Sequence, residues 1–114
     1  MNNVYDLAHE LARSLKETDQ YKNYAAVKAR VDAEPDLAKM VNDFQEKNME
    51  VQTQAMLNGG KAPEDLTQQL QQLYAVVAQD PLAAQYFAAE WSYTQVVSEI
   101  YGILGEAIRF EKLV

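Results

Sequence analysis

The feature that most constrains the fold is an apolar heptad spacing in the C-terminal third of the chain. Alternating steps of four and three residues connect Leu82, Tyr86, Ala89, Tyr93, Val96, Ile100, Ile103, Ala107 and Phe110. This spacing keeps side chains on one side of an α-helix and is typical of a coiled-coil seam. Pro81 fixes φ and lacks an N–H, which suits the first helical turn. We therefore predict one long helix over residues 81–113.

The rest of the chain is also predicted to be helical. Of its 114 residues only four are Gly and three are Pro, and 48% are apolar, which is ample for a packed core. Helical apolar spacing, interrupted by caps and prolines, predicts helices over about 4–17, 19–33 and 35–57, and one that starts at Pro63. We expect an all-α fold of about five helices, two of them long, in a single domain over 1–114.

Local signals mark the helix ends. Asn3, Thr18 or Asp19, and Asp80 are suited to cap helix starts. Pro35 starts a helix for the same reason as Pro81. The segment NGGKAP at 58–63 supplies a glycine stop, and we expect it to be the most mobile internal segment.

The last helix predicts association with a second copy of the chain. At 1.5 Å per residue it would be ~50 Å long, whereas a compact chain of this size is only roughly 35 Å across. Its apolar face is also too wide for one neighbouring helix, and Gly102 and Gly105 would permit close approach. We expect an antiparallel helical bundle completed by homodimerisation, with this predicted interface: Val96, Val97, Ile100, Tyr101, Ile103, Leu104, Ala107 and Ile108.

Asn48 stands where the apolar spacing of residues 35–57 expects an apolar side chain. One such Asn in a helical interface can fix register or partner number. Alternatively, a straight helix drifts relative to the heptad and carries Asn48 to the boundary of the apolar stripe. The sequence leaves both interpretations open.

Several function classes are disfavoured. A net charge of −7 disfavours nucleic-acid binding, and the absence of Cys removes thiolate chemistry and cysteine-bound clusters. HELAR at 9–13 lacks the second His of a zinc-protease motif, and Asp6 with His9 lacks a third ligand. We expect no enzyme, no cofactor and no metal. With no signal-peptide pattern and no membrane span, a cytoplasmic location is expected.

Four segments carry a family resemblance: VYDLAHELARSLKETDQY, MVNDFQEKNMEVQTQAM, EDLTQQLQQLYAVV and FAAEWSYTQVVSEIYGIL. They resemble the YlbF/YmcA family of small bacterial helical proteins, in its YheA-like branch. The resemblance implies an all-helical, homodimeric, cytoplasmic protein. It also implies a non-enzymatic regulator of competence, sporulation or biofilm formation that works with an RNA-processing complex. Some relatives bind iron–sulfur clusters through cysteines, which this chain lacks.

The resulting hypothesis is an adaptor whose helical surfaces bind first a second copy and then an unidentified protein partner. The alternative is a regulator that contacts RNA directly through Lys22, Lys28 and Arg30.

Overall fold

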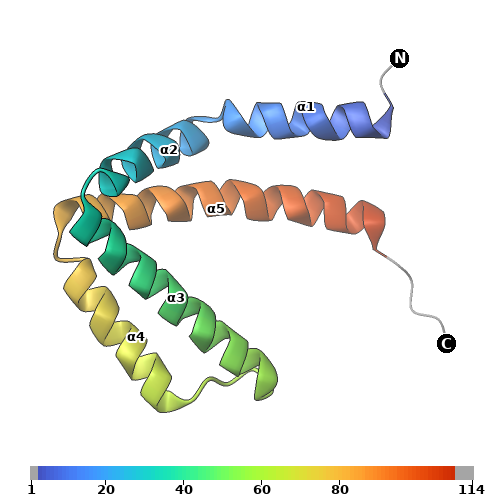
Figure 1. The fold of residues 1–114 in the computed structure, drawn as a ribbon. Helices are drawn as coiled ribbons and strands as arrows, with labels where there is room; N and C mark the ends of the chain where they lie inside the picture. Colours follow the sequence, from blue (N-terminus) through green and yellow to red (C-terminus); the bar gives the residue numbers. More distant parts are fainter. Residues whose placement is uncertain (1–2, 110–114) are drawn as a thin grey trace. The chain divides into compact units, whose positions relative to one another are not determined.

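The computed structural model describes residues 3–109, which form five α-helices and no strand (Figure 1). The helices are α1 (Val4–Lys16), α2 (Asp19–Asp32), α3 (Pro35–Leu57), α4 (Glu64–Val77) and α5 (Pro81–Ile108). The predicted all-α class is confirmed, with α3 and α5 as the two long helices. The boundaries agree with the predicted ones to within one residue, except at the end of α5.

Side chains cap the first two helices as their residue types predict. Asn3 Oδ1 accepts a hydrogen bond from the Asp6 N–H at 2.9 Å, and the Asp6 carboxylate accepts one from the Asn3 N–H, which completes a capping box. The Thr18 hydroxyl oxygen accepts a hydrogen bond from the Tyr21 N–H at 3.2 Å. These bonds satisfy N–H groups that have no partner within the helix.

An acidic residue followed by a proline marks the start of both α3 and α5. Only one of the two acidic side chains, Glu34 or Asp80, caps its helix. Pro35 and Pro81 are the first residues of α3 and α5, as predicted. The Asp80 carboxylate accepts hydrogen bonds from two N–H groups of the first turn, at 2.8 and 3.2 Å. Glu34 makes no such bond, and Glu is not among the residue types preferred at this position. Proline therefore sets the start in both cases, and Asp80 adds a cap.

The predicted end of α5 is wrong. The helix stops at Ile108 and Arg109 is no longer helical, so α5 has 28 residues, about 42 Å at 1.5 Å per residue. Neither a glycine just after the last turn nor a proline marks this end in the sequence. Phe110 and Leu113, part of the predicted helix, lie outside the described residues.

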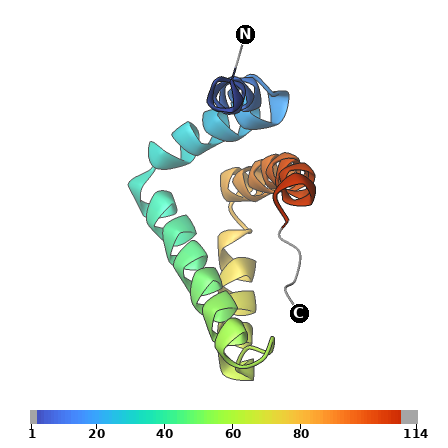
Figure 2. The same cartoon turned by 90° about the vertical axis from the view of Figure 1, so that its right-hand side faces the viewer.

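The described residues divide into two compact units. The hairpin unit spans Val27–Phe87 and the terminal unit contains residues 3–26 and 88–109. Figures 1 and 2 show α3 and α4 of the hairpin unit side by side, joined by the loop at 58–63. The expectation of one domain over 1–114 stays a prediction.

The buried core lies mainly in the hairpin unit. Val77 is completely inaccessible at the end of α4. The other buried residues of this unit lie on α2, on α3 and at the start of α5: Val27, Val31, Leu37, Val41, Ala83 and Tyr86.

An aromatic cluster joins three helices of the hairpin unit. The rings of Phe44, Tyr74 and Phe87 lie 5.1–5.5 Å apart, in the tilted and edge-on arrangements that aromatic rings prefer. Beside them, the Gln45 side-chain N–H donates to the Tyr86 hydroxyl at 2.9 Å. These contacts fasten α3 to α4 and to the first turns of α5.

The loop between α3 and α4 is fixed at its first residues. Gly59 and Gly60 have φ of 71° and 96°, a left-handed region that favours glycine. The Gly60 N–H donates to the Ala55 carbonyl at 2.6 Å, as in a Schellman helix end. The glycines therefore close α3 as predicted, and one of them is held by a hydrogen bond.

Replacing Asp80 with Ala should lower the free energy of unfolding by about 1 kcal/mol, because two N–H groups lose their acceptor. Urea denaturation measures the loss. Asp80→Asn keeps an acceptor and should stay close to the unmodified protein. Glu34→Ala is the matched control, with a change below about 0.5 kcal/mol. Equal losses for Asp80→Ala and Glu34→Ala would show that the Asp80 cap contributes nothing.

Amide hydrogen exchange should be fastest, among internal segments, in the loop at 58–63. We expect Gly59 and Lys61 to exchange rapidly and Gly60 more slowly, because its N–H is bonded to Ala55. Site-resolved exchange by NMR tests this order. Exchange at Gly59 as slow as at Val96 would contradict the predicted mobility.

Candidate interaction surface

The candidate site is the apolar face at the C-terminal end of α5. We call it the α5 face and define it by the eight residues predicted as the interface. Val96, Val97 and Ile100 are half-buried within the single chain, whereas the other five are exposed. Tyr101 and Ile103 expose 69% and 70% of their surface. The α5 face therefore becomes more open toward the end of the helix.

Contacts with α2 explain the partial cover at the beginning of this face. The Tyr93 ring lies 5.3 Å from Tyr24 in a stacked arrangement and 5.4 Å from Tyr21 edge-on. These rings belong to the terminal unit. Their contacts cover the heptad line of α5 at Tyr93, one turn before Val96. Ala89, one turn earlier, is 3% exposed. Within the terminal unit, the seam is thus packed where α2 reaches it and open beyond.

The two glycines of α5 meet nothing in the single chain. A Cβ atom built on Gly102 or Gly105 would have no atom within 4 Å. Among residues 3–109 no other helix approaches these glycines closely, and their close approach to a second copy stays a prediction. Both positions offer open space to another molecule.

A second apolar surface lies on α1. None of the residues of α1 is buried. Val4, Leu7 and Leu11 expose 70%, 53% and 37% of their surface. Their three- and four-residue spacing was visible in the sequence, but the spacing does not say whether the same chain covers the stripe.

Asn48 is half-buried on α3, in the hairpin unit, whereas the α5 face belongs to the terminal unit. The neighbouring Lys47 contacts Glu50 in a salt bridge and donates to Gln69 of α4, both at 3.2 Å. The position is compatible with both interpretations, so the register-setting role of Asn48 stays a prediction.

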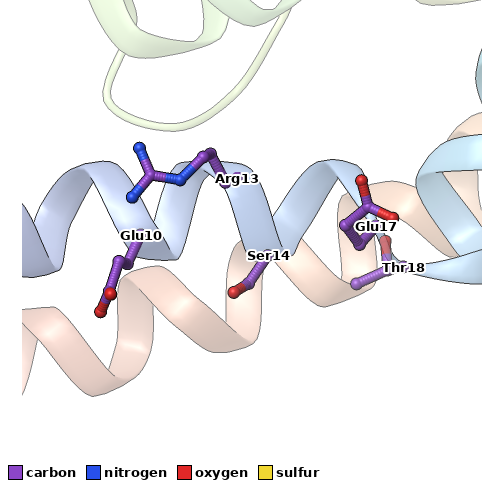
Figure 3. Close-up of a pocket in the computed structure, with 5 residues that line it drawn as sticks. All are labelled: Glu10, Arg13, Ser14, Glu17 and Thr18. Carbon is purple, nitrogen blue, oxygen red and sulfur yellow. The ribbon is translucent and has the colours of Figure 1, made fainter.

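A shallow hollow of about 440 Å³ lies along α1 and the turn after it, lined by Glu10, Arg13, Ser14, Glu17 and Thr18 (Figure 3). In this view Glu10 and Ser14 extend to one side of α1 and the Arg13 guanidinium to the other. The Thr18 hydroxyl is held by the backbone of Leu15, to which it donates at 2.7 Å. The hollow therefore lacks the convergent polar groups of an active site.

Two further properties concern residues 3–109. In this range no group of three His, Cys, Asp or Glu side chains is placed to hold a metal ion. None of the five helices described here combines the length and apolarity needed to cross a bilayer.

Two of the three basic residues of the RNA alternative are paired with carboxylates. Lys22 lies in the terminal unit, and Lys28 and Arg30 lie in the hairpin unit. Lys22 pairs with Glu17 at 3.3 Å and Lys28 with Asp32 at 2.7 Å. The carboxylates offset the positive charge that phosphates would need, so this arrangement does not favour RNA contact.

Exposed methionines mark a separate surface on the hairpin unit. Met49 and Met56 are seven residues apart on one side of α3 and expose 69% and 83% of their surface. Met49 borders a hollow of about 300 Å³ that is also lined by Asn42, Gln45 and Glu46. Flexible thioether side chains adapt to varied apolar partners, so this is a second surface suited to protein contact.

Comparison with known proteins identifies relatives along the whole described chain. A family model described as "Control of competence regulator ComK, YlbF/YmcA" matches residues 4–109. A UPF0342 protein of Caldicellulosiruptor bescii is 33% identical over 97% of this chain and 92% of its own length. One from Symbiobacterium thermophilum is 35% identical over 92% of this chain and 93% of its own.

A UPF0342 protein of Shouchella clausii is 30% identical over 95% of this chain and 91% of its own length. No solved structure matches the chain significantly. The family model covers nearly all of the chain, on the same helices whose segments carried the sequence resemblance. The chain therefore belongs to the YlbF/YmcA family.

Proposed function

We propose that this protein is a non-enzymatic regulatory adaptor that works as a homodimer in the bacterial cytoplasm. The observation that carries the proposal is the α5 face, where Tyr101, Ile103 and Ile108 are each more than 60% exposed. Adjacent large apolar side chains on a soluble chain mark an interaction site. The family description, control of a competence regulator, names a regulatory role and no reaction.

A second copy of the chain is the proposed occupant of the α5 face. Burying each aliphatic side chain there stabilises the assembly by roughly 1.5–3 kcal/mol when the burial is complete. Several such side chains offset the loss of translational and rotational freedom on association. Residues 1–114 then act as one domain whose core is completed by its partner. Gly102 and Gly105 leave room for a helix of the second copy to approach closely.

The hairpin unit is the proposed contact for a different protein. Its methionine surface on α3 lies in a different unit from the α5 face, and Met49 and Met56 are exposed. One surface for self-association and another for a partner is the minimum that an adaptor requires. The partner would act in the regulation named by the family description, in an RNA-processing complex as the resemblance implies.

Replacing Ile100 and Leu104 together with Glu should prevent dimerisation, because two charges would have to be buried in an apolar interface. Sedimentation at micromolar concentration should give twice 12.9 kDa for the unmodified protein and a monomer or an unfolded chain for the variant. Gln95→Glu with Ser98→Glu adds two charges at exposed positions outside the α5 face and should leave the dimer intact. A stable monomer of the unmodified protein would refute the proposal.

Replacing Asn48 with Leu should raise the melting temperature and permit alternative oligomers if Asn48 lies in a helical interface. Calorimetry and size-exclusion chromatography measure the two effects. Asn42→Leu, at an exposed position of the same helix, is the control and should change neither. An unchanged dimer with a lowered melting temperature would instead place Asn48 at the boundary of the stripe.

A further inference from the structure

The terminal unit contains two open apolar surfaces, on helical segments of the same length. The helix α1 has 13 residues and its apolar stripe extends from Val4 through Leu11. The part of α5 that carries the α5 face, 96–108, also has 13 residues. Both segments are therefore about 20 Å long. The apolar stripe of α1, from Val4 through Leu11, therefore fits within the length of the α5 face.

The helix α1 needs such a cover. Isolated helices shorter than ~12–15 residues are marginal in water, because few backbone hydrogen bonds offset the cost of nucleation. The capping box at Asn3 stabilises its first turn, but no residue of α1 is buried in the single chain. Its stripe follows i, i+3 and i+4 spacing, so Val4, Leu7 and Leu11 lie on one side and can be buried together.

The area of the α5 face alone is small for a stable dimer. At about 25 cal/mol per Å², a fully buried aliphatic side chain corresponds to roughly 60–120 Å². The exposed parts of Tyr101, Ile103, Leu104 and Ile108 then amount to roughly 200–400 Å². A standard interface buries about 800 Å² on each partner. The exposed stripe of α1 adds roughly 100–200 Å² from the same chain.

We propose that α1 of one copy packs on the α5 face of a second copy, and α1 of the second copy on the α5 face of the first. The inference rests on the homodimer proposed above and adds α1 as the second surface of its interface. A twofold axis would produce the contact twice, because residue i meets residue j in both directions. One arrangement thus covers both open surfaces, which the single chain leaves exposed.

The absence of Cys from the sequence permits a direct test by disulfide formation between separately labelled chains. A tagged chain with Leu11→Cys is refolded with an untagged chain carrying Tyr101→Cys or Leu104→Cys. These two positions lie opposite Leu11 when the helices run antiparallel or parallel, respectively. A disulfide forms only when the Cα atoms come within about 7 Å, so a tagged–untagged covalent dimer on a non-reducing gel reports contact between copies.

Arg13→Cys is the matched control, because Arg13 follows Leu11 by two residues and lies on the other side of α1. We expect the mixed covalent dimer with Leu11→Cys at a yield several times that with Arg13→Cys. A dimeric preparation without this cross-link, or with cross-links only between identical positions, would overturn the inference and leave the homodimer standing. A monomeric preparation would instead overturn the homodimer itself.

A second measurement does not depend on cysteine geometry. Leu11→Glu should raise the dimer dissociation constant at least about tenfold, because a charge replaces a buried apolar group. Arg13→Glu should change it less than about twofold, because that position stays in solvent. Circular dichroism verifies that both variants keep their helices. Equal effects of the two substitutions would count against α1 as part of the interface.

Discussion

The structure depends on the burial of apolar side chains around Val77 in the hairpin unit. Val77 is the largest side chain that is fully inaccessible among those described, and it lies at the end of α4 just before α5 begins. The Phe44, Tyr74 and Phe87 rings extend this core along α3 and α4. Apolar burial is the main favourable term in folding, so this unit contains most of what stabilises the single chain.

The terminal unit has a different balance. Of its described residues only Ala89 is buried, while large apolar side chains on α1 and α5 remain exposed. The Tyr21, Tyr24 and Tyr93 rings are its main internal contact. A unit with so little core gains stability from further burial, which the proposed homodimer would supply. The burial of apolar side chains therefore explains both the fold of the hairpin unit and the function proposed for the terminal unit.

Much of the fold could be predicted because its signals are local. Pro35, Pro81 and Asp80 fix helix starts through backbone geometry and a nearby acceptor, and these predictions are confirmed. The predicted end of α5 was wrong because no glycine or proline marks the observed end. Apolar periodicity predicted that the residues of the α5 face lie on one helix. It could not predict that α1 is exposed, because an apolar stripe does not show which element covers it. Membership of the YheA-like branch stays a prediction.

The open stripe of α1 also bears on how long a lone copy would survive in a cell. Because no residue of α1 is buried, the helix can unfold without disturbing the core around Val77. Proteases cleave segments that unfold locally, at a rate set by how often they open. A copy without a partner would thus offer residues 4–16 as a cleavage site, whereas a dimer would protect them. Proteolysis would then remove unassembled chains selectively and couple the abundance of the protein to its assembly.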